Sequence, residues 1–236
     1  MDNIDTVPAV KLFVDFDGTV TQTDVGDTIF ENFLLPELQE QNWHEWIINE
    51  WKAGRMSSEE CLDRECENTV VTVDEFNGVL DRISLTPGFP DTVRYCGDTG
   101  IPLMILSDGF DYYIEYILEK HGIEDVAYRA NHLYFKDNGR LGVTFPHQEK
   151  GCGRCGNCKR RHMKKRSQNG ELILYAGDGY SDRYAIHEAD VVFARFELAE
   201  YCDTKNLNYI PFKDFHDILA FVKNIVRKPH YEIQKP

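Results

Sequence analysis

The sequence predicts an α/β fold, a doubly wound parallel sheet that carries an inserted helical subdomain. Short apolar runs that read as buried strands alternate with helical patterns, which indicates a parallel sheet covered on both faces. About sixty residues with helical patterning separate the first two predicted strands. We therefore expect a core made of residues 1–22 and 86–236, with a helical insert at 23–85. The chain has 236 residues, 42% of them hydrophobic, which is enough for this arrangement.

Strands are predicted where short apolar runs stand between turn-forming residues, at 11–14, 101–106, 126–130, 172–176 and 190–194. Residues 132–143 predict a hairpin, because Asp137-Asn138-Gly139 is a favourable turn sequence. Residues 112–121 predict an amphipathic helix that ends at Gly122, and residues 215–226 predict a closing helix.

Helices are predicted throughout the insert. Apolar residues recur at helical spacing from Ile29 until Pro36 interrupts the pattern. Trp43, Trp46 and Trp51 form a second apolar stripe, which we interpret as packing in a core rather than ligand stacking. Acidic residues behind a serine at 57–60, and again from residue 73, are typical of helix starts.

The composition excludes several classes of protein. The net charge of −14 argues against a general nucleic-acid binder. The first residues show no basic segment followed by an apolar one, so no signal peptide is predicted. Apolar runs are too short to span a bilayer, so no membrane partner is expected. With seven cysteines and no export signal, a reduced cytoplasmic setting is expected.

Polar residues follow three of the predicted strands. Asp15 and Asp17 end the first, Ser107 ends the second and Asp178 ends the fourth. Open parallel sheets bind ligands at the carboxyl ends of their strands. In extended backbone, residues two apart share a face, so Asp15 and Asp17 can reach the same small volume. Two close carboxylates repel each other, so such a pair needs a cation, a shared proton or a shell of hydrogen-bond donors. The pattern predicts chemistry on an anion with a metal ion present.

These motifs identify a family resemblance. DFDGT at 15–19, LSDG at 106–109 and GDGYSD at 177–182, with a lysine before the last, resemble the signature of the haloacid dehalogenase superfamily of phosphohydrolases. The resemblance covers nearly the whole chain. Asp24, nine residues after Asp15, resembles the phosphoserine-phosphatase branch. Cys158-Lys159 and the segment from Val192 to Cys202 resemble the methionine-salvage phosphatases, which act on a methylthiopentenyl enol phosphate.

The resemblance implies a mechanism and a set of site residues. Asp15 would be the nucleophile that forms an aspartyl-phosphate, and Asp17 the general acid and base. Asp17 would bind the metal through its backbone carbonyl. The implied phosphate-binding residues are Ser107, Asp108, Gly109 and Lys159, with Lys150 as the alternative lysine. The implied Mg²⁺ residues are Asp15, Asp17, Asp178 and Asp182, the last as a supporting carboxylate.

The insert would be a cap over the active site, and its small size implies a small phosphorylated metabolite as partner. Asp24 and Arg55 are candidate substrate contacts. Phosphoserine and phosphoethanolamine or phosphocholine are alternative substrates. Asp108 stands where phosphoserine phosphatases usually have glycine, which weakens phosphoserine. A dehalogenase or phosphomutase is the rival reaction, and Asp17 argues against the dehalogenase. The sequence leaves the oligomeric state open.

A cysteine cluster stands outside this resemblance. Cys152, Cys155 and Cys158 form C-x-x-C-x-x-C, a spacing compatible with structural Zn²⁺. A closed site needs a fourth ligand, for which His147, His162 or Cys202 could serve. A small-residue loop that positions Lys159 is the alternative, favoured because no second cysteine pair is evident. A zinc-dependent regulatory or RNA-binding module at 152–166 is the rival function of another class.

Overall fold

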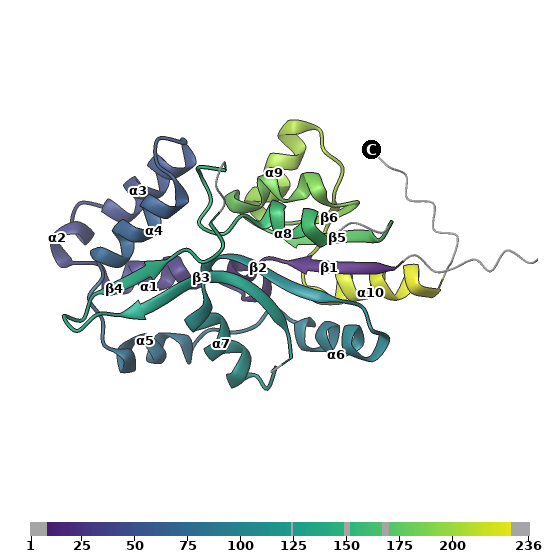
Figure 1. Cartoon of the computed structure of the whole chain (residues 1–236), viewed down its shortest axis with the longest axis horizontal. Coiled ribbons are helices and arrows are strands. Elements are labelled where there is room, and N and C mark those ends of the chain that lie inside the picture. Colours follow the sequence, from purple (N-terminus) through teal and green to yellow (C-terminus); the bar gives the residue numbers. More distant parts are fainter. Residues whose placement is uncertain (1–8, 124, 149–151, 167–169, 228–236) are drawn as a thin grey trace, which may run out of the picture. The chain divides into compact units, whose positions relative to one another are not determined.

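The computed structural model describes residues 9–123, 125–148, 152–166 and 170–227 (Figure 1). Its chain divides into two compact units. The first unit comprises Met1–Asp15, Leu85–Ile105 and Lys159–Pro236, and the second comprises Phe16–Ser84 and Leu106–Cys158. This grouping places residues 106–158 with the insert. The predicted division into a core and a cap at 23–85 stays a prediction.

The first unit is built on parallel strands. Its strands are β1 (Val10–Val14), the start of β2 (Leu103–Phe110), β5 (Leu172–Gly177), β6 (Val191–Ala194) and β7 (Ile210–Pro211). β1 lies between β2 and β5, with Leu12 opposite Leu103 on one side and Leu174 on the other. Every residue of β5 is buried. Such a continuous apolar run is typical of a strand covered on both faces.

The helices of the first unit follow the strands. They are α6 (Phe89–Thr99), α8 (Lys159–Arg166), α9 (Phe196–Lys205), α10 (Phe215–Arg227) and the short 3₁₀ turns η2 (Tyr180–Tyr184) and η3 (Ile186–Glu188). α6 and α10 pack together through Phe89 and Phe215, whose ring centroids are 4.9 Å apart (Figure 1). The predicted closing helix is therefore present, and it closes the core of this unit.

The second unit holds the helices of the insert. Its elements are η1 (Phe16–Val20), α1 (Val25–Phe33), α2 (Pro36–Gln39), α3 (Trp43–Lys52), α4 (Ser58–Glu67), α5 (Val73–Leu80), the end of β2, α7 (Asp111–Lys120), β3 (Ala127–Phe135) and β4 (Leu141–Thr144). Ser57 and Thr72 begin α4 and α5, each in a reciprocal capping box with a glutamate. The predicted helix starts are confirmed.

The tryptophan stripe divides between core and surface. Trp43 and Trp51 pack against a small core around Ile47, as the packing interpretation requires. Trp46, on the same helix, is exposed.

The seven strands form one sheet in the order β4-β3-β2-β1-β5-β6-β7. This confirms the predicted α/β class. β3 and β4 pair antiparallel, with Leu133 opposite Val143, which confirms the predicted hairpin. β2 continues through Ser107 to Phe110, and β3 joins the predicted third strand to the first arm of the hairpin. Within the described residues no helix is long and apolar enough to cross a membrane.

Candidate active site

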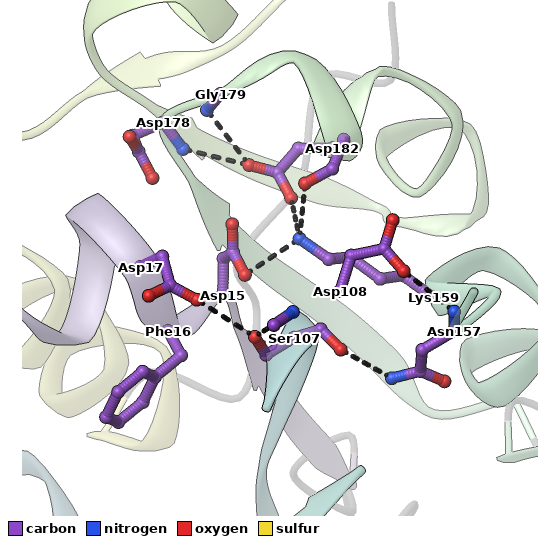
Figure 2. Close-up of polar contacts among 12 residues, drawn as sticks. Asp15, Phe16, Asp17, Ser107, Asp108, Asn157, Lys159, Asp178, Gly179 and Asp182 are labelled. Atoms are coloured by element: carbon purple, nitrogen blue, oxygen red, sulfur yellow. Dashed lines mark hydrogen bonds and ion pairs between the residues drawn. The ribbon is translucent and has the colours of Figure 1, made fainter. Parts of the chain in front are cut away.

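The end of β1 and the start of α8 bring Asp15 and Lys159 together in the first unit. Asp15 extends the β1 ladder, since its N–H donates to the carbonyl of Ala176 at 2.9 Å. Its side chain therefore leaves the sheet at the carboxyl end of β1. The Nζ of Lys159 lies 2.7 Å from Oδ1 of Asp15, and both side chains are buried (Figure 2). The predicted lysine is thus in contact with the predicted nucleophile.

Asp182 holds this lysine and the turn after β5. Its Oδ1 accepts from Nζ of Lys159 at 2.6 Å and from the hydroxyl of Tyr175 at 2.5 Å. Its Oδ2 accepts from the N–H groups of Asp178 and Gly179 at 3.0 and 3.1 Å (Figure 2). Both oxygens are therefore used by donors of the protein itself, which suits a supporting carboxylate more than a metal ligand.

The donor set at this end of the sheet fits a hard cation. Carboxylate oxygens of Asp15, Asp178 and Asp182 all lie within 4.8 Å of one another. Oxygen ligands of this kind are the ones that Mg²⁺ prefers. Lys159 is the cation that contacts Asp15 and Asp182, and it balances one of the three carboxylates. A divalent ion would compensate the remaining negative charge, so these residues fit the cofactor that the family resemblance implies.

The ionisation of the pair reflects the same balance. Burial and the Asp182 carboxylate raise the pKa of Asp15, while Lys159 lowers it. Burial lowers the pKa of Lys159, but Asp15 and Asp182 outweigh this and raise it above its ordinary value. The lysine therefore stays protonated and supplies a fixed positive charge beside Asp15.

A second group of residues surrounds Asp17 in the second unit. Its Oδ2 accepts from the hydroxyls of Ser107 and Tyr113, at 3.1 and 2.7 Å. Its Oδ1 accepts from the N–H of Val25 at 3.1 Å. The hydroxyl oxygen of Ser107 in turn accepts from the N–H of Gly109 at 2.9 Å (Figure 2). The end of β2 thus orients the Asp17 carboxylate, as expected from residues that share one function.

Sequence reasoning did not identify Tyr113. Burial and the neighbouring Asp17 carboxylate raise its pKa well above the ordinary value, so the phenol stays neutral and can donate to Asp17. Its ring stacks on Phe16, with centroids 5.8 Å apart. The signal was present in its position, because a residue in the first turn of a helix points back toward the preceding strand end.

Gly109 leaves the space that this arrangement needs. A Cβ atom at this position would lie 1.6 Å from the hydroxyl of Tyr113 and 2.6 Å from Oδ2 of Asp17. Any other residue would displace one of these groups, so the glycine of the second motif is required by close approach.

The side chain of Asp108 is engaged in hydrogen bonds within the protein. Its Oδ2 accepts from the hydroxyl of Ser58 at the start of α4. Its Oδ1 accepts from the N–H of Asn157 at 2.7 Å (Figure 2). The side-chain amide of Asn157 donates to the carbonyls of Ser107 and Arg129 at 2.7 and 2.8 Å. The carboxylate therefore ties three segments together, and phosphate binding at Asp108 stays a prediction.

The two candidate substrate contacts of the insert lie in local interactions. Asp24 caps α1, where its Oδ1 accepts from the N–H of Asp27 at 2.8 Å. Arg55 forms a two-pronged ion pair with Glu50, and its side chain is 62% exposed. Substrate binding by Asp24 and Arg55 stays a prediction. Lys150, the alternative lysine, lies outside the described residues.

Residues 10–209 match the model of the family described as "Putative Phosphatase". The chain belongs to this family. The predicted superfamily and the predicted phosphatase activity are therefore confirmed, and the protein is an enzyme that acts on a phosphate monoester.

Two relatives match this phosphatase over almost its full length. The 2-hydroxy-3-keto-5-methylthiopentenyl-1-phosphate phosphatase of Lysinibacillus sphaericus (strain C3-41) is 30% identical over 226 residues, 93% of this chain and 96% of its own. The protein of the same name from Bacillus thuringiensis (strain Al Hakam) is 26% identical over 225 residues, 92% of this chain and 98% of its own.

Among solved structures, a substrate-bound phosphoserine phosphatase complex resembles this phosphatase with a TM-score of 0.65 and 20% identity. The similarity covers 90% of this chain and 98% of that chain. At this identity it shows a shared fold, which agrees with the predicted α/β class.

Proposed function

We propose that this phosphatase hydrolyses a small-molecule phosphate monoester through an aspartyl-phosphate on Asp15, with Mg²⁺ as cofactor. The observation that carries the proposal is the position of Lys159, whose ammonium group lies 2.7 Å from Asp15 and 2.6 Å from Asp182. A buried cation beside a buried carboxylate at a strand end is the environment that attack on a phosphate anion requires.

The two groups of residues act on one substrate because the chain connects them. Asp15 and Asp17 are separated by Phe16 alone, so their Cα atoms lie at most about 7 Å apart. Lys159 follows Asn157 by two residues, and Ser107 continues the strand that pairs with β1. We therefore take Asp15 as acting on the phosphorus atom and Asp17 as acting on the leaving oxygen of the same phosphate ester.

In the first step, a carboxylate oxygen of Asp15 attacks phosphorus and the bond to the ester oxygen breaks. Asp17 gives its proton to the departing oxygen, which leaves as an alcohol or enol. Hydrogen bonds from Ser107 and Tyr113 hold Asp17 in one orientation for this transfer. Lys159 stabilises the charge that develops on the phosphoryl oxygens.

In the second step, water attacks the phosphorus of the aspartyl-phosphate. Asp17, now ionised, takes a proton from this water, phosphate is released and Asp15 is regenerated. When bound, Mg²⁺ supplies positive charge that lets two anions approach each other. Asp15 and Asp178 would hold it together with the backbone carbonyl of Asp17, while Asp182 positions Lys159.

For the substrate, we propose the methylthiopentenyl enol phosphate of methionine salvage. The support is the activity named for two relatives that match more than 90% of the chain at 26–30% identity. Phosphoserine, phosphoethanolamine and phosphocholine are the alternatives. We further propose that the enzyme works in the cytoplasm on such metabolites, without nucleic acid as a partner.

The test is phosphate release by the purified protein with Mg²⁺ across these substrates. We expect the highest kcat/KM for the methylthiopentenyl enol phosphate. Asp15→Asn should reduce kcat by at least about a thousandfold, because the amide cannot form the covalent intermediate. Asp91→Asn is the matched control, since Asp91 is an exposed carboxylate paired with Arg94, and it should keep full activity.

Three results would contradict the proposal in whole or in part. A high rate with Asp15→Asn, in protein with an unchanged circular dichroism spectrum, would exclude Asp15 as the nucleophile. A preference for one of the alternative substrates would keep the chemistry and replace the proposed substrate. A protein with no phosphatase rate but with stoichiometric zinc would favour the zinc-dependent module instead.

A further inference from the structure

The loop before α8 brings three cysteines together. The Sγ atoms of Cys152, Cys155 and Cys158 all lie within 4.8 Å of one another, and those of Cys152 and Cys155 are 3.5 Å apart. None of the three is in a disulfide. A disulfide would need a separation of about 2.05 Å and would use only two of them, so pairing does not account for the cluster.

The spacing of the three sulfur atoms fits a single thiophilic cation. Zn²⁺ binds thiolate sulfur at about 2.3 Å in a tetrahedral arrangement, which places neighbouring sulfurs about 3.8 Å apart. The 3.5 Å between the sulfurs of Cys152 and Cys155 is close to this value, and the sulfur of Cys158 lies within 4.8 Å of both. We infer that Cys152, Cys155 and Cys158 bind Zn²⁺, a site that goes beyond the proposed phosphatase chemistry.

The loop is held in this form by contacts outside the cysteines. The N–H of Ser58 donates to the carbonyl of Arg154 at 2.7 Å, and the N–H of Asn157 donates to Asp108 at 2.7 Å. Gly153 turns the chain between the first two cysteines with φ +65°, which other residues rarely adopt. Because these contacts fix the backbone on both sides of Cys155, little ordering remains to be done when a cation binds.

The three cysteines differ in solvent exposure, so one end of the site is held in the protein and the other is open to solvent. Cys158 is buried, Cys155 is intermediate and Cys152 is exposed. Within the described residues the cluster comprises these three ligands, so a water molecule completes the tetrahedron. Each thiol loses its proton to solvent as its sulfur binds the cation, and no oxidant or reductant is required.

The position of the site in the chain indicates its purpose. Cys158 immediately precedes Lys159, and Asn157 contacts both Ser107 and Asp108. A cation held by the three cysteines therefore fixes the segment from which the active-site lysine emerges.

The experiment is metal binding by the full-length protein, purified with reductant and kept in excess Mg²⁺. Mass spectrometry of bound metals should give one Zn²⁺ per chain. Replacement of Zn²⁺ by Co²⁺ should give a thiolate-to-cobalt charge-transfer band, which carboxylate ligands at Asp15 and Asp178 cannot produce. The readout is therefore independent of the phosphatase activity and of the substrate.

Cys152→Ser is the principal variant, because Cys152 is exposed and its replacement leaves the core unchanged. We expect it to weaken Zn²⁺ binding by more than the roughly tenfold that loss of an outer contact costs, and to reduce the cobalt band. Cys96→Ser, a cysteine of α6 outside the cluster, should keep both. Absence of the band in the wild type, its persistence in Cys152→Ser, or a Cys152–Cys155 disulfide found in the purified protein would each overturn the inference.

Discussion

At the scale of single residues, Tyr113 defines the orientation of the proposed acid and base. Its hydroxyl donates to Oδ2 of Asp17 at 2.7 Å, and the same oxygen accepts from Ser107. The remaining oxygen of Asp17 accepts from the N–H of Val25. The carboxylate is therefore fixed on both oxygens, and Tyr113 acts through Asp17 as a positioning residue.

Tyr113→Phe should reduce kcat by about 10- to 100-fold while KM changes little, because correct placement of a general acid contributes rate and not ground-state binding. Steady-state kinetics with any accepted phosphate ester measures this. Tyr112→Phe is the neighbouring control, since its hydroxyl bonds Asn77 instead. Equal losses in both variants would show that Tyr113 matters only for folding.

Of the residues that the structure brings together at the candidate site, the sequence could predict those that directly follow a strand or a recognisable motif. Asp15 and Ser107 follow apolar runs directly, and Lys159 is marked by its Cys-Lys context. Tyr113 and Asn157 could not be predicted in the same way. The place of Tyr113 in the first turn of α7 puts it near the end of β2, but it does not show that the hydroxyl reaches Asp17. The direction of Asn157 depends on an irregular loop and does not follow from spacing in the chain.

At the scale of elements, Asp108 joins α4, β2 and the loop before α8. The carboxylate accepts from Ser58 in α4 and from the N–H of Asn157 in the loop. Asn157 is buried, so its N–H depends on an acceptor inside the protein, and the Asp108 carboxylate is that acceptor. The position of the loop thus depends on a residue of the second motif.

Asp108→Ala should lower the free energy of unfolding by about 1–3 kcal/mol, since it leaves a buried donor unsatisfied. It should also lower kcat/KM, because the segment leading to Lys159 loses its anchor. Denaturant unfolding and kinetics measure the two effects. Asp91→Ala, at an exposed position, should change stability by less than about 0.5 kcal/mol. Full activity and stability in Asp108→Ala would contradict this assignment.

An ionic cluster that includes the buried Glu65 links three helices of the insert. His44 in α3 lies 3.0 Å from Glu65 in α4 and 3.3 Å from Asp27 in α1. Burial lowers the pKa of His44, but hydrogen bonds and charge from Asp27 and Glu65 outweigh it and raise the pKa to about 10. Burial raises the pKa of Glu65, against the lowering by His44. The imidazolium is therefore retained at neutral pH.

Because its folded pKa is raised, His44 contributes stability that is complete below its unfolded value of about 6.5 and is lost as the pH rises through about 10. The raised pKa of Glu65 acts in the same direction at lower pH. The melting temperature should fall between pH 7 and pH 10, and His44→Gln should flatten this dependence. His121→Gln, at an exposed position, should keep the wild-type slope. Parallel slopes in all three proteins would exclude His44 as the source.

Element prediction succeeded where periodicity was strong and failed where polar residues interrupted it. α6 was not predicted, because Pro90 and Gly97 make its sequence read as a loop. α9 was missed because only Leu198 and Cys202 of its face are buried. β2 was predicted to end before Ser107, whereas hydrogen bonds of the second motif continue the strand to Phe110. In each case the helix or strand depends on contacts with other parts of the fold, which the local sequence pattern does not show.

At the scale of the whole molecule, the carboxylate cluster couples metal binding to stability. Asp15, Asp178 and Asp182 repel one another in the folded state and are separated in the unfolded chain. Mg²⁺ should therefore raise the melting temperature, by an amount that corresponds to about 2.7 kcal/mol at one hundred times its dissociation constant. Chelation of Mg²⁺ should abolish the phosphatase activity, and added Mg²⁺ should restore it.

Asp178→Asn separates this effect from general ionic stabilisation. The variant should melt at the same temperature with and without Mg²⁺, whereas Asp91→Asn should respond like the wild type. A thermal shift that is unchanged in Asp178→Asn would place the bound cation elsewhere on this chain of net charge −14.

The pairing of β1 also has a consequence for folding during translation. β1 is translated before both of its neighbours in the sheet, because β2 and β5 are encoded far downstream of it. Until Leu172–Gly177 has been translated, the apolar strand β1 has one edge without its partner strand in the nascent chain. We expect this interval to make the polypeptide a client of chaperones during translation, and its yield to depend on them more than its final stability would suggest.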